Sequence, residues 1–255
     1  MKWKTIGNSV KGTSHLATGK NCEDAIQYRV VTDGEGKEIL LCCASDGAGS
    51  AKYAVDASFY TTRKIIDGLA DPAFIESGFT ETGLYSIVEH IYAGLTEGAN
   101  DNGVALNEYS CTLLGCFITA DKAAFFQVGD GAIVRNDGSG FYTPVWWPQN
   151  GEYQNATSFL VDDPTFSNLK ITILNEAVNE VAIFTDGLQM LALNMEASNA
   201  HQPFFTPLFN HLQMADDEQK INVLNRKLEE FLNSAAINDR TDDDKTLFLA
   251  TRLPA

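Results

Sequence analysis

The sequence lacks several features that would each define a class of protein. No apolar run approaches the length needed to cross a bilayer, so a membrane-spanning protein is not expected. The first six residues (Met-Lys-Trp-Lys-Thr-Ile) are too short and too polar for a secretion signal, which makes the cytosol the expected location. There is no internal repeat, low-complexity tract or clear linker. The length allows one large domain or two small ones with a sizeable core, and we expect a single domain over residues 1–255.

Cysteine is scarce and shows no pattern. The five cysteines are an odd number without Cys-x-x-Cys spacing, which argues against a disulfide framework and against a zinc site. Cys22 stands beside an acidic pair and is expected to be more exposed, with no histidine close in sequence to activate it as a nucleophile. The others lie inside apolar runs and are expected to be reduced core residues: Cys42, Cys43, Cys111 and Cys116.

Positive charge is also scarce. The chain has 18 basic residues against 34 acidic ones, for a net charge of −16. Nucleic acid and anionic membranes are poor partners for such a surface. A phosphorylated substrate would be repelled by the same field, so its binding would require metal ions or local basic side chains.

Acidic residues, by contrast, gather in short stretches, most of them at an edge of a strongly apolar run. The stretches are residues 21–24 (Asn-Cys-Glu-Asp), 45–49 (Ser-Asp-Gly-Ala-Gly), 185–187 (Thr-Asp-Gly) and 242–246 (Asp-Asp-Asp-Lys-Thr). An Asp that ends a buried strand and precedes Gly must reach water, a hydrogen-bond donor or a cation. A sheet that brought several such ends together would form a cluster of hard oxygen ligands, which suits Mg²⁺ or Mn²⁺.

The apolar pattern predicts a mixture of strands and helices. Strands are expected at residues 38–45, 109–119, 123–128, 131–135, 169–174, 180–185 and 246–251, and helices at 50–68, 82–98 and 216–232. Residues 129–131 (Gly-Asp-Gly) are expected to turn a hairpin between two of these strands. The short connections within 109–135 and 169–185 exclude βαβ crossovers, so neighbouring strands there should pair antiparallel, which favours an α+β domain.

The order of the motifs resembles that of the metal-dependent type-2C Ser/Thr protein phosphatase family, in particular its bacterial members. The matching motifs are residues 21–24, 46–49, 110–112 (Ser-Cys-Thr), 129–131, 185–188 and 243–246, which span almost the whole chain. Each is weak alone, because Asp-Gly pairs are usually turns, but six in order are specific. The resemblance implies a four-layer αββα sandwich, with two central antiparallel β-sheets flanked by helices and metals at one end.

The resemblance also implies which residues hold the metals. Asp46 matches the carboxylate that bridges two divalent cations, Mn²⁺ or Mg²⁺, and the carbonyl of Gly47 matches a further ligand. Asp186 and Asp243 match the remaining direct ligands. Asp130 matches the position that helps to hold a third metal in many bacterial members.

The implied reaction is hydrolysis of phosphoserine and phosphothreonine by a metal-activated water. The residues implied to be catalytic are Asp46, together with Asp24 and Glu23, which match the outer partners that orient the metal-bound waters. The expected partners are phosphorylated proteins and, in opposition, a Ser/Thr kinase. We expect a monomer.

Three positions depart from the family pattern. Asp244 stands where Asn is usual, and Ala48 stands where many eukaryotic members have a His that serves as general acid. Gly19 stands where many members have the Arg that grips the substrate phosphate. Lys20 and His15 are the candidates for that contact, although a solvated Lys and a locally hydrogen-bonded His explain these two residues equally well.

Two questions stay open at the level of sequence. Residues 141–168 correspond to the family's variable flap, in which Trp146 and Trp147 either face the substrate or cover a sheet edge. The second question is function: a catalytically weak phosphoprotein-binding module and a small-molecule phosphohydrolase are the alternatives to a protein phosphatase. Three converging carboxylates argue against a pure binding module, which does not need them.

Overall fold

The computed structural model describes residues 2–136, 138–148 and 157–253. The chain divides into two compact units, each of which we describe by itself. The first, here called the N/C unit, comprises residues 1–22, 131–148 and 177–255, and the second, the central unit, comprises residues 23–130 and 149–176. The expectation of one domain over the whole chain stays a prediction.

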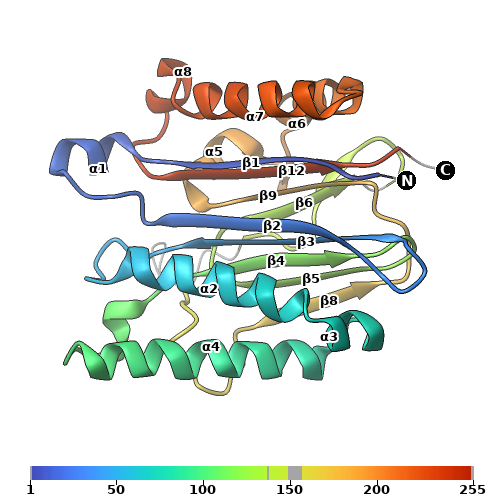
Figure 1. Cartoon of the computed structure of the whole chain (residues 1–255). Helices are drawn as coiled ribbons and strands as arrows, with labels where there is room; N and C mark the ends of the chain where they lie inside the picture. The colour runs from blue at the N-terminus through green and yellow to red at the C-terminus, as the bar shows by residue number, and fades with distance from the viewer. Residues whose placement is uncertain (1, 137, 149–156, 254–255) are drawn as a thin grey trace. The chain divides into compact units, whose positions relative to one another are not determined.

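The central unit is built on a five-stranded antiparallel sheet. The strands are β2 (Asp24–Thr32), β3 (Glu38–Asp46), β4 (Leu113–Ile118), β5 (Ala123–Val128) and β8 (Lys170–Leu174), in the order β2-β3-β4-β5-β8. Its helices are α2 (Ala54–Leu69), α3 (Pro72–Ser77), α4 (Glu81–Asp101) and the 3₁₀ turn η1 (Leu106–Tyr109). Helix α2 contacts β2 and β3, and α4 runs beside α2 (Figure 1).

The pattern of apolar residues explains this packing. Residues 40–44 of β3 are completely buried, as expected of an inner strand covered on both faces. Along α2 the buried residues recur at helical spacing, from Ala54 through Ala57 and Thr61 to Ile65. Helix α4 is capped by Thr80, whose hydroxyl accepts from Gly83 N at 3.0 Å and so satisfies one amide of the first turn.

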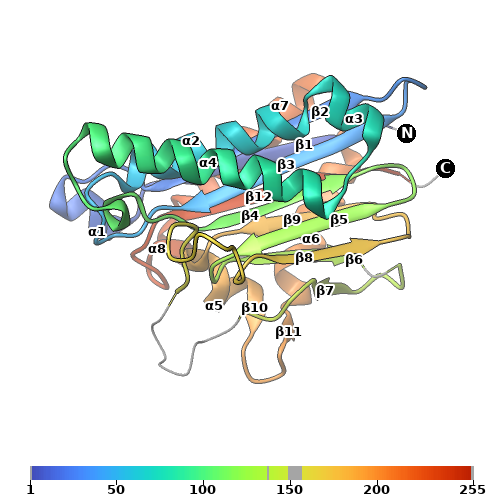
Figure 2. The same ribbon diagram turned by 90° about the horizontal axis from the view of Figure 1, so that it is seen from below.

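The N/C unit contains the second five-stranded antiparallel sheet. Its strands are β1 (Lys4–Val10), β12 (Lys245–Thr251), β9 (Glu180–Phe184), β6 (Ala132–Asn136) and β7 (Tyr142–Pro144), in the order β1-β12-β9-β6-β7. The other elements are α1 (Thr13–Thr18), η2 (Asp186–Leu188), α5 (Gln189–Ala192), the hairpin of β10 (Leu193–Asn194) and β11 (Asn199–Ala200), α6 (Gln202–Met214), α7 (Glu218–Leu232) and α8 (Ala235–Asn238). Helix α7 lies along β1 (Figure 1), and the hairpin follows directly on α5 (Figure 2).

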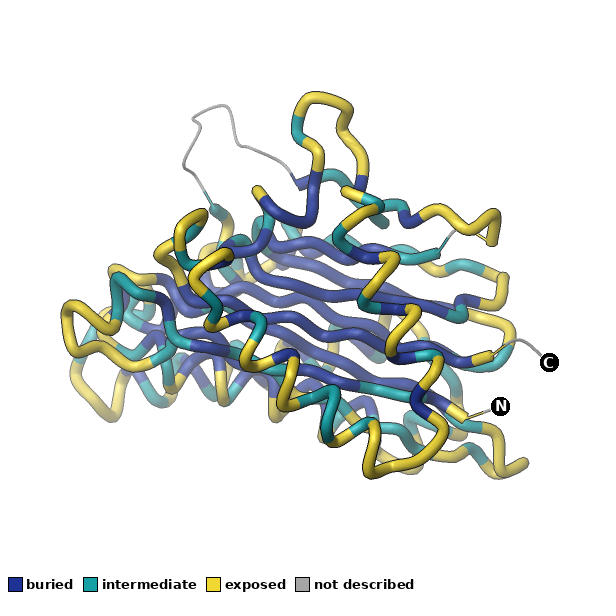
Figure 3. The backbone as a smooth tube through the Cα atoms, turned by 90° about the horizontal axis from the view of Figure 1, so that it is seen from above, coloured by how far each residue is buried: buried dark blue, intermediate teal, exposed yellow. Residues whose placement is uncertain are grey.

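Aromatic rings fill much of the core beneath these helices. Tyr142 of β7 stacks on Phe209 of α6, with 4.9 Å between ring centroids, and Phe205 packs against both Tyr142 and Phe184 of β9. In each unit the inner strands are buried along most of their length, whereas many of the connecting turns are exposed (Figure 3). No helix in the described part of the chain is long and apolar enough to cross a membrane.

The structure confirms most of the expected elements and corrects two pairings. The strand at 38–45, the helices at 82–98 and 216–232 and the last strand are present, and the four apolar-run cysteines are buried and free, with Cys22 partly exposed. The hairpin across residues 129–131 is wrong, because β5 pairs with β4 and β8 whereas β6 pairs with β7 and β9. The expected pairing within 169–185 is wrong for the same reason, since β8 and β9 belong to different sheets.

Candidate active site

In the central unit, two carboxylates face each other across neighbouring strands. The antiparallel register places Asp24, the first residue of β2, directly opposite Asp46, the last residue of β3. Directly opposed residues on paired strands point to the same face of the sheet. Glu23, the residue before Asp24, accepts a hydrogen bond at its carbonyl from Gly47 N at 3.1 Å. Both Glu23 and Asp24 are buried, whereas Asp46 is partly exposed.

The end of β3 is fixed by Thr112, which gives the Ser-x-Thr motif a structural role. Its hydroxyl accepts from Asp46 N at 2.8 Å, and its own amide donates to the carbonyl of Asp46 at 2.8 Å. Ser45 Oγ donates to the carbonyl of Thr112 at 2.5 Å, and Ala48 N donates to the carbonyl of Ser110 at 2.9 Å. The backbone on both sides of the Asp46 side chain is therefore held by hydrogen bonds, a positioning role that the motif alone did not reveal.

Gly47 lies where a side chain has no room. A Cβ on Gly47 would stand 2.6 Å from the carbonyl oxygen of Ala54, at the start of α2. The turn after β3 is therefore packed tightly against the first residue of the helix. This close approach explains the Gly after Asp46 by packing alone, beside the metal contact expected for its carbonyl.

Asp130 joins the same group, although it is not a hairpin tip. A carboxylate oxygen of Asp130 lies within 4.8 Å of one of Asp46. Gly129, with a φ of 108°, lets the chain turn here, and a Cβ on it would stand 2.6 Å from Cγ2 of Thr112. Thr157 Oγ1 donates to Oδ2 of Asp130, which identifies Thr157 as a positioning residue that sequence patterns did not predict.

The chemistry of this group fits a divalent cation. Ionised carboxylates only accept hydrogen bonds, and like charges directly opposite each other on paired strands are destabilising. Asp46 and Asp130 therefore form a set of oxygen atoms that a hard cation stabilises, and Asp24 stands opposite Asp46 in the strand register. Among the described residues, no thiol or imidazole belongs to this set, so it suits Mg²⁺ or Mn²⁺ better than Zn²⁺.

The N/C unit brings the two other acidic motifs together. Asp186 follows β9 and Asp243 precedes β12, and these strands pair antiparallel. The junction is locked by Thr246 N, which donates to Thr185 Oγ1 at 3.0 Å. A Cβ on Gly187 would overlap the carbonyl oxygen of Asp244 and would stand 3.5 Å from Cβ of Asp243.

Asp243 carries a perturbed carboxyl group. The residue is exposed as a whole, but partial shielding of its carboxyl from water raises its pKa, and the hydrogen bond from Asp244 N at 2.8 Å opposes that rise. The charge of Asp244 raises the pKa further, and His15 lowers it. A nearby cation stabilises the ionised form of a carboxylate that stands among other negative charges.

Asp244 itself is buried and bonded from two sides. Its Oδ1 accepts from Gly12 N at 2.6 Å, and its Oδ2 lies 3.0 Å from Nδ1 of His15. Ser14 adds two hydrogen bonds to the carbonyl of Asp242, from its amide at 2.9 Å and from its hydroxyl at 2.7 Å. The start of α1 is thus docked on residues 242–244, and this gives His15 a fixed place beside the acidic motif.

The missing Arg at position 19 also has a structural reason. Gly19 caps the C-terminal end of α1 with a φ of 74°, a left-handed conformation that favours glycine over a side-chain-bearing residue. Lys20 follows it and is exposed. Of the two candidates for phosphate contact, His15 is therefore held in place beside Asp244, whereas the side chain of Lys20 is exposed.

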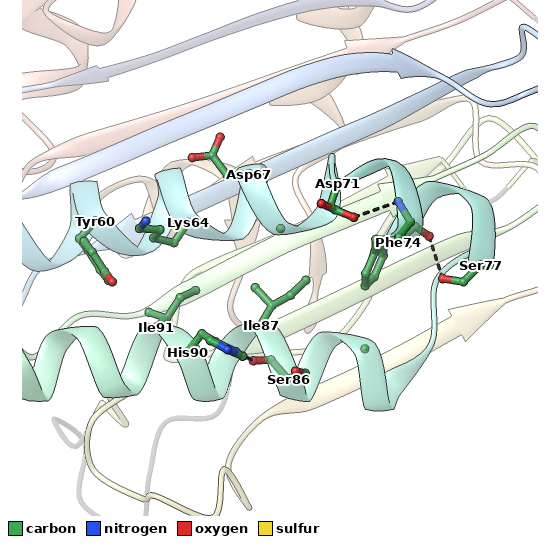
Figure 4. A pocket seen from close by; sticks show the side chains of 13 residues that line it. Tyr60, Lys64, Asp67, Asp71, Phe74, Ser77, Ser86, Ile87, His90 and Ile91 are labelled. Atoms are coloured by element: carbon green, nitrogen blue, oxygen red, sulfur yellow. Dashed lines mark hydrogen bonds between the residues drawn. The ribbon is translucent and has the colours of Figure 1, made fainter.

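A hollow elsewhere in the central unit plays no part in this chemistry. It measures about 680 Å³ and lies between α2, α3 and α4, lined among others by Tyr60, Lys64, Phe74 and His90 (Figure 4). None of the predicted site residues lines it. Its ionisable residues carry both signs of charge, among them Asp67, Asp71 and Lys64, and the acidic motifs rather than this hollow identify the candidate active site.

Comparison with known proteins agrees with this chemistry. The model of the protein phosphatase 2C family matches residues 11–233. Serine/threonine-protein phosphatase 3 of Escherichia coli (strain K12) is 37% identical over 98% of both chains. A crystal structure of a bacterial serine phosphatase superposes with a TM-score of 0.66 over 100% of this chain and 99% of the other, at 16% identity. A crystal structure of RsbX in complex with magnesium gives a TM-score of 0.55 at 18% identity, over 98% and 94%.

The chain belongs to the protein phosphatase 2C family. The predicted fold class, α+β with two antiparallel sheets flanked by helices, is confirmed, as is the predicted enzyme class of serine/threonine-protein phosphatase. The alternative of a catalytically weak binding module finds no support in these similarities.

Proposed function

We propose that this chain hydrolyses phosphoserine and phosphothreonine in proteins with the help of two divalent cations, Mg²⁺ or Mn²⁺. The observation that carries the proposal is the register that sets Asp24 opposite Asp46 at the ends of paired strands, with Asp130 alongside. Such an array of acceptors is costly without a cation and well suited to one. The magnesium held by RsbX, a protein of the same fold, supports this choice of metal.

The proposed metal ligands follow the family pattern. Asp46 would bridge the two cations and the carbonyl of Gly47 would be a further ligand, while Asp186 and Asp243 would complete the coordination. Asp130, close to Asp46, is proposed for a third cation. When bound, the cations would lower the pKa of a water molecule to near neutrality and neutralise charge on the phosphoryl oxygens.

The protein's own groups would position the reactants. Hydrogen bonds to Thr112 hold the backbone of Asp46, so its carboxylate needs little reorganisation. The buried carboxylates of Asp24 and Glu23 would accept hydrogen bonds from water and orient it toward phosphorus. Ala48 has no proton to give, so the proton for the leaving serine or threonine oxygen would come from water.

We propose that His15 contacts the substrate phosphate. Asp244 orients the imidazole through Nδ1, which leaves Nε2 to point away from that carboxylate. Lys20, exposed and five residues further along the chain, would add positive charge. Both residues offset the repulsion between a phosphoprotein and a chain of net charge −16.

The wider setting is proposed on the family resemblance. A phosphatase for phosphoserine and phosphothreonine would oppose a Ser/Thr kinase, and it would act as a monomer in the cytoplasm of a bacterial cell. The chain would function as one catalytic domain over residues 1–255, with the flap at about 141–168 beside the active site. Residues 149–156 of that flap lie outside the described residues, whereas Trp146 and Trp147 are described.

Hydrolysis of p-nitrophenyl phosphate and of a phosphothreonine peptide tests the proposal. We expect turnover with Mn²⁺ or Mg²⁺, none with a chelator, and loss of turnover in Asp46→Ala. Asp101→Ala, which removes an exposed carboxylate at the end of α4, is the matched control and should keep full activity. Phosphopeptide binding without turnover under every metal condition would contradict the proposal and favour the binding module.

A further inference from the structure

A groove in the N/C unit begins directly after the motif that contains Asp186. It measures about 590 Å³ and is bounded by α5, the β10–β11 hairpin, the start of α6 and α8. Figure 2 shows α5 beside the β10–β11 hairpin. Met190, on its wall, is four residues after Asp186, so their Cα atoms are at most about 14 Å apart.

Most of the residues that line the groove are apolar, and two of its phenylalanines connect it to the core. Phe204 packs edge-on against the fully buried Phe205, with 5.1 Å between ring centroids, and lies 6.2 Å from Phe231. These rings therefore form a preformed surface. Two methionines also line the groove, Met190, which is 74% exposed, and Met195. Unbranched methionines adapt to different apolar side chains, as at promiscuous binding surfaces.

The charge at the groove comes from an arginine, although the protein is strongly acidic. The chain has 34 acidic residues, but no Asp or Glu is among the residues that line the groove. The ionisable side chains there are Arg240 and His201. Among the described residues, the guanidinium of Arg240 has no ion-pair partner, and the residue is exposed. The groove thus matches an apolar segment that carries a carboxylate.

We propose that this groove docks a segment of the phosphoprotein substrate itself, which rests on the function proposed above. The segment would place a large apolar side chain between Met190 and Phe204 and a carboxylate at Arg240. The separation of about 14 Å or less between Met190 and Asp186 corresponds to roughly four residues of extended chain, so the docked residues lie about three to six positions from the phosphorylated residue. Substrate selection then depends on residues beyond the phosphoryl group.

Phosphopeptide kinetics test this docking. Phosphothreonine peptides would carry a Leu-Asp pair three to six positions before or after the phosphorylated residue, or Ala-Ala in its place. For the wild type we expect KM to be about tenfold lower with the better-placed Leu-Asp pair, with similar kcat; tenfold corresponds to about 1.4 kcal/mol. Met190→Glu and Arg240→Glu should each remove that preference while kcat/KM for p-nitrophenyl phosphate stays within about twofold.

Matched variants and a charge swap make the result specific. Met214→Glu changes a methionine that is 75% exposed at the end of α6, outside the groove, and Arg226→Glu changes an exposed arginine of α7. Both should keep the preference. A Leu-Lys peptide should regain a low KM with Arg240→Glu but not with the wild type, which a loss of folding could not produce.

The possible failures are distinguishable. If the wild type hydrolyses neither p-nitrophenyl phosphate nor any phosphopeptide with Mn²⁺ or Mg²⁺, the proposed function fails and the docking fails with it. If it hydrolyses both but all peptides show one KM, or if Met190→Glu and Arg240→Glu behave like their controls, the docking alone is overturned. Concentration-dependent dimers that Met190→Glu abolishes would assign the groove to a second copy of this chain and would also overturn it.

Discussion

Nδ1 of His15 lies 3.0 Å from Oδ2 of Asp244, and this pair explains why an aspartate occupies position 244. The other oxygen of Asp244 accepts from Gly12 N at 2.6 Å. A carboxylate can accept at both oxygens, whereas an Asn offers one acceptor and one donor. Asp244 thus ties the start of α1 to the loop before β12 and orients an imidazole at the same time.

The Asp244 contacts predict a graded loss of stability. Asp244→Ala leaves Gly12 N and His15 without their acceptor and should lower the free energy of unfolding by about 1.5–3 kcal/mol, the range for hydrogen bonds to charged groups. Asp244→Asn should cost less, because one acceptor remains. Urea denaturation measures both. Asp242→Ala, which changes an exposed neighbour, is the control, and equal stability of Asp242→Ala and Asp244→Ala would contradict the role given to this residue.

His15 also predicts a change in substrate binding. His15→Ala should raise KM for a phosphothreonine peptide by about tenfold, as expected for loss of one charge-assisted contact, and should leave the affinity for Mn²⁺ unchanged. Lys20→Ala, which removes an exposed charge, should have the smaller effect. Initial-rate kinetics at saturating Mn²⁺ decide the matter, and an unaltered KM in His15→Ala would remove this residue from phosphate binding.

Substituting two glycines by alanine tests how tightly the acidic motifs are packed. In Gly187→Ala the new Cβ would overlap the carbonyl oxygen of Asp244, so the loop before β12 must move, at a cost of about 1–3 kcal/mol in stability. Metal-dependent turnover should fall with it, because Asp243 stands on the same loop. Gly49→Ala is the matched control, since its nearest neighbour would be Glu23 Oε2 at 3.7 Å. Thermal unfolding and p-nitrophenyl phosphate assays of both variants provide the comparison.

The turn around Asp163 predicts a pH dependence of stability. Its Oδ1 accepts from Thr165 N and Oγ1 at 2.8 and 2.7 Å, and its Oδ2 accepts from Ser167 N and Oγ. These bonds, led by that from the Ser167 hydroxyl, hold the pKa of Asp163 well below its usual range. They stabilise a turn in which Phe166 has a φ of 53° and buries its ring against Tyr92.

A lowered folded-state pKa fixes the sign of the effect. The ionised Asp163 stabilises the fold above its unfolded pKa of about 3.9, and that contribution is lost as pH falls through the lower folded value. Asp163→Ala should therefore lower the Tm at pH 7, and the difference from wild type should shrink progressively below about pH 4. The exposed Asp101→Ala serves as control. A Tm difference that stays constant between pH 7 and pH 2.5 would contradict this assignment.

The fold could be predicted from sequence where burial is continuous, and not elsewhere. The sequence predicts β3 and α4 because burial imposes a clear apolar pattern on each. In β3 apolar residues stand at nearly every position, and in α4 they recur at every third or fourth. Strand β1 pairs only with β12, and its polar and apolar residues alternate weakly, so the sequence pattern does not predict it. Helix α6 was also missed, since it contains Pro207 and is held instead by Phe205 and Phe209 in the core.

The sequence predicts the carboxylates of the candidate site, but it does not predict the residues that hold them in place by hydrogen bonds. Asp46, Asp186 and Asp243 are visible because acidic residues at the ends of apolar runs have no place in a core. The Gly-Asp-Gly motif at 129–131 predicts a hairpin that does not form, since a local turn signal does not say which sheet the next strand joins. The roles of Thr112, Thr157 and Asp244 depend on contacts between residues far apart in the chain, which no local pattern contains.

Titration calorimetry of Mn²⁺ at pH 7.5, with wild type, Asp46→Ala, Asp186→Ala and the double variant, tests the central claim most directly. If Asp46 and Asp186 share the cations, each single variant should lose at least about tenfold in Mn²⁺ affinity, and the double variant should be little worse than either single one. Wild-type affinity in either single variant, or losses that simply add in the double variant, would contradict a shared metal centre.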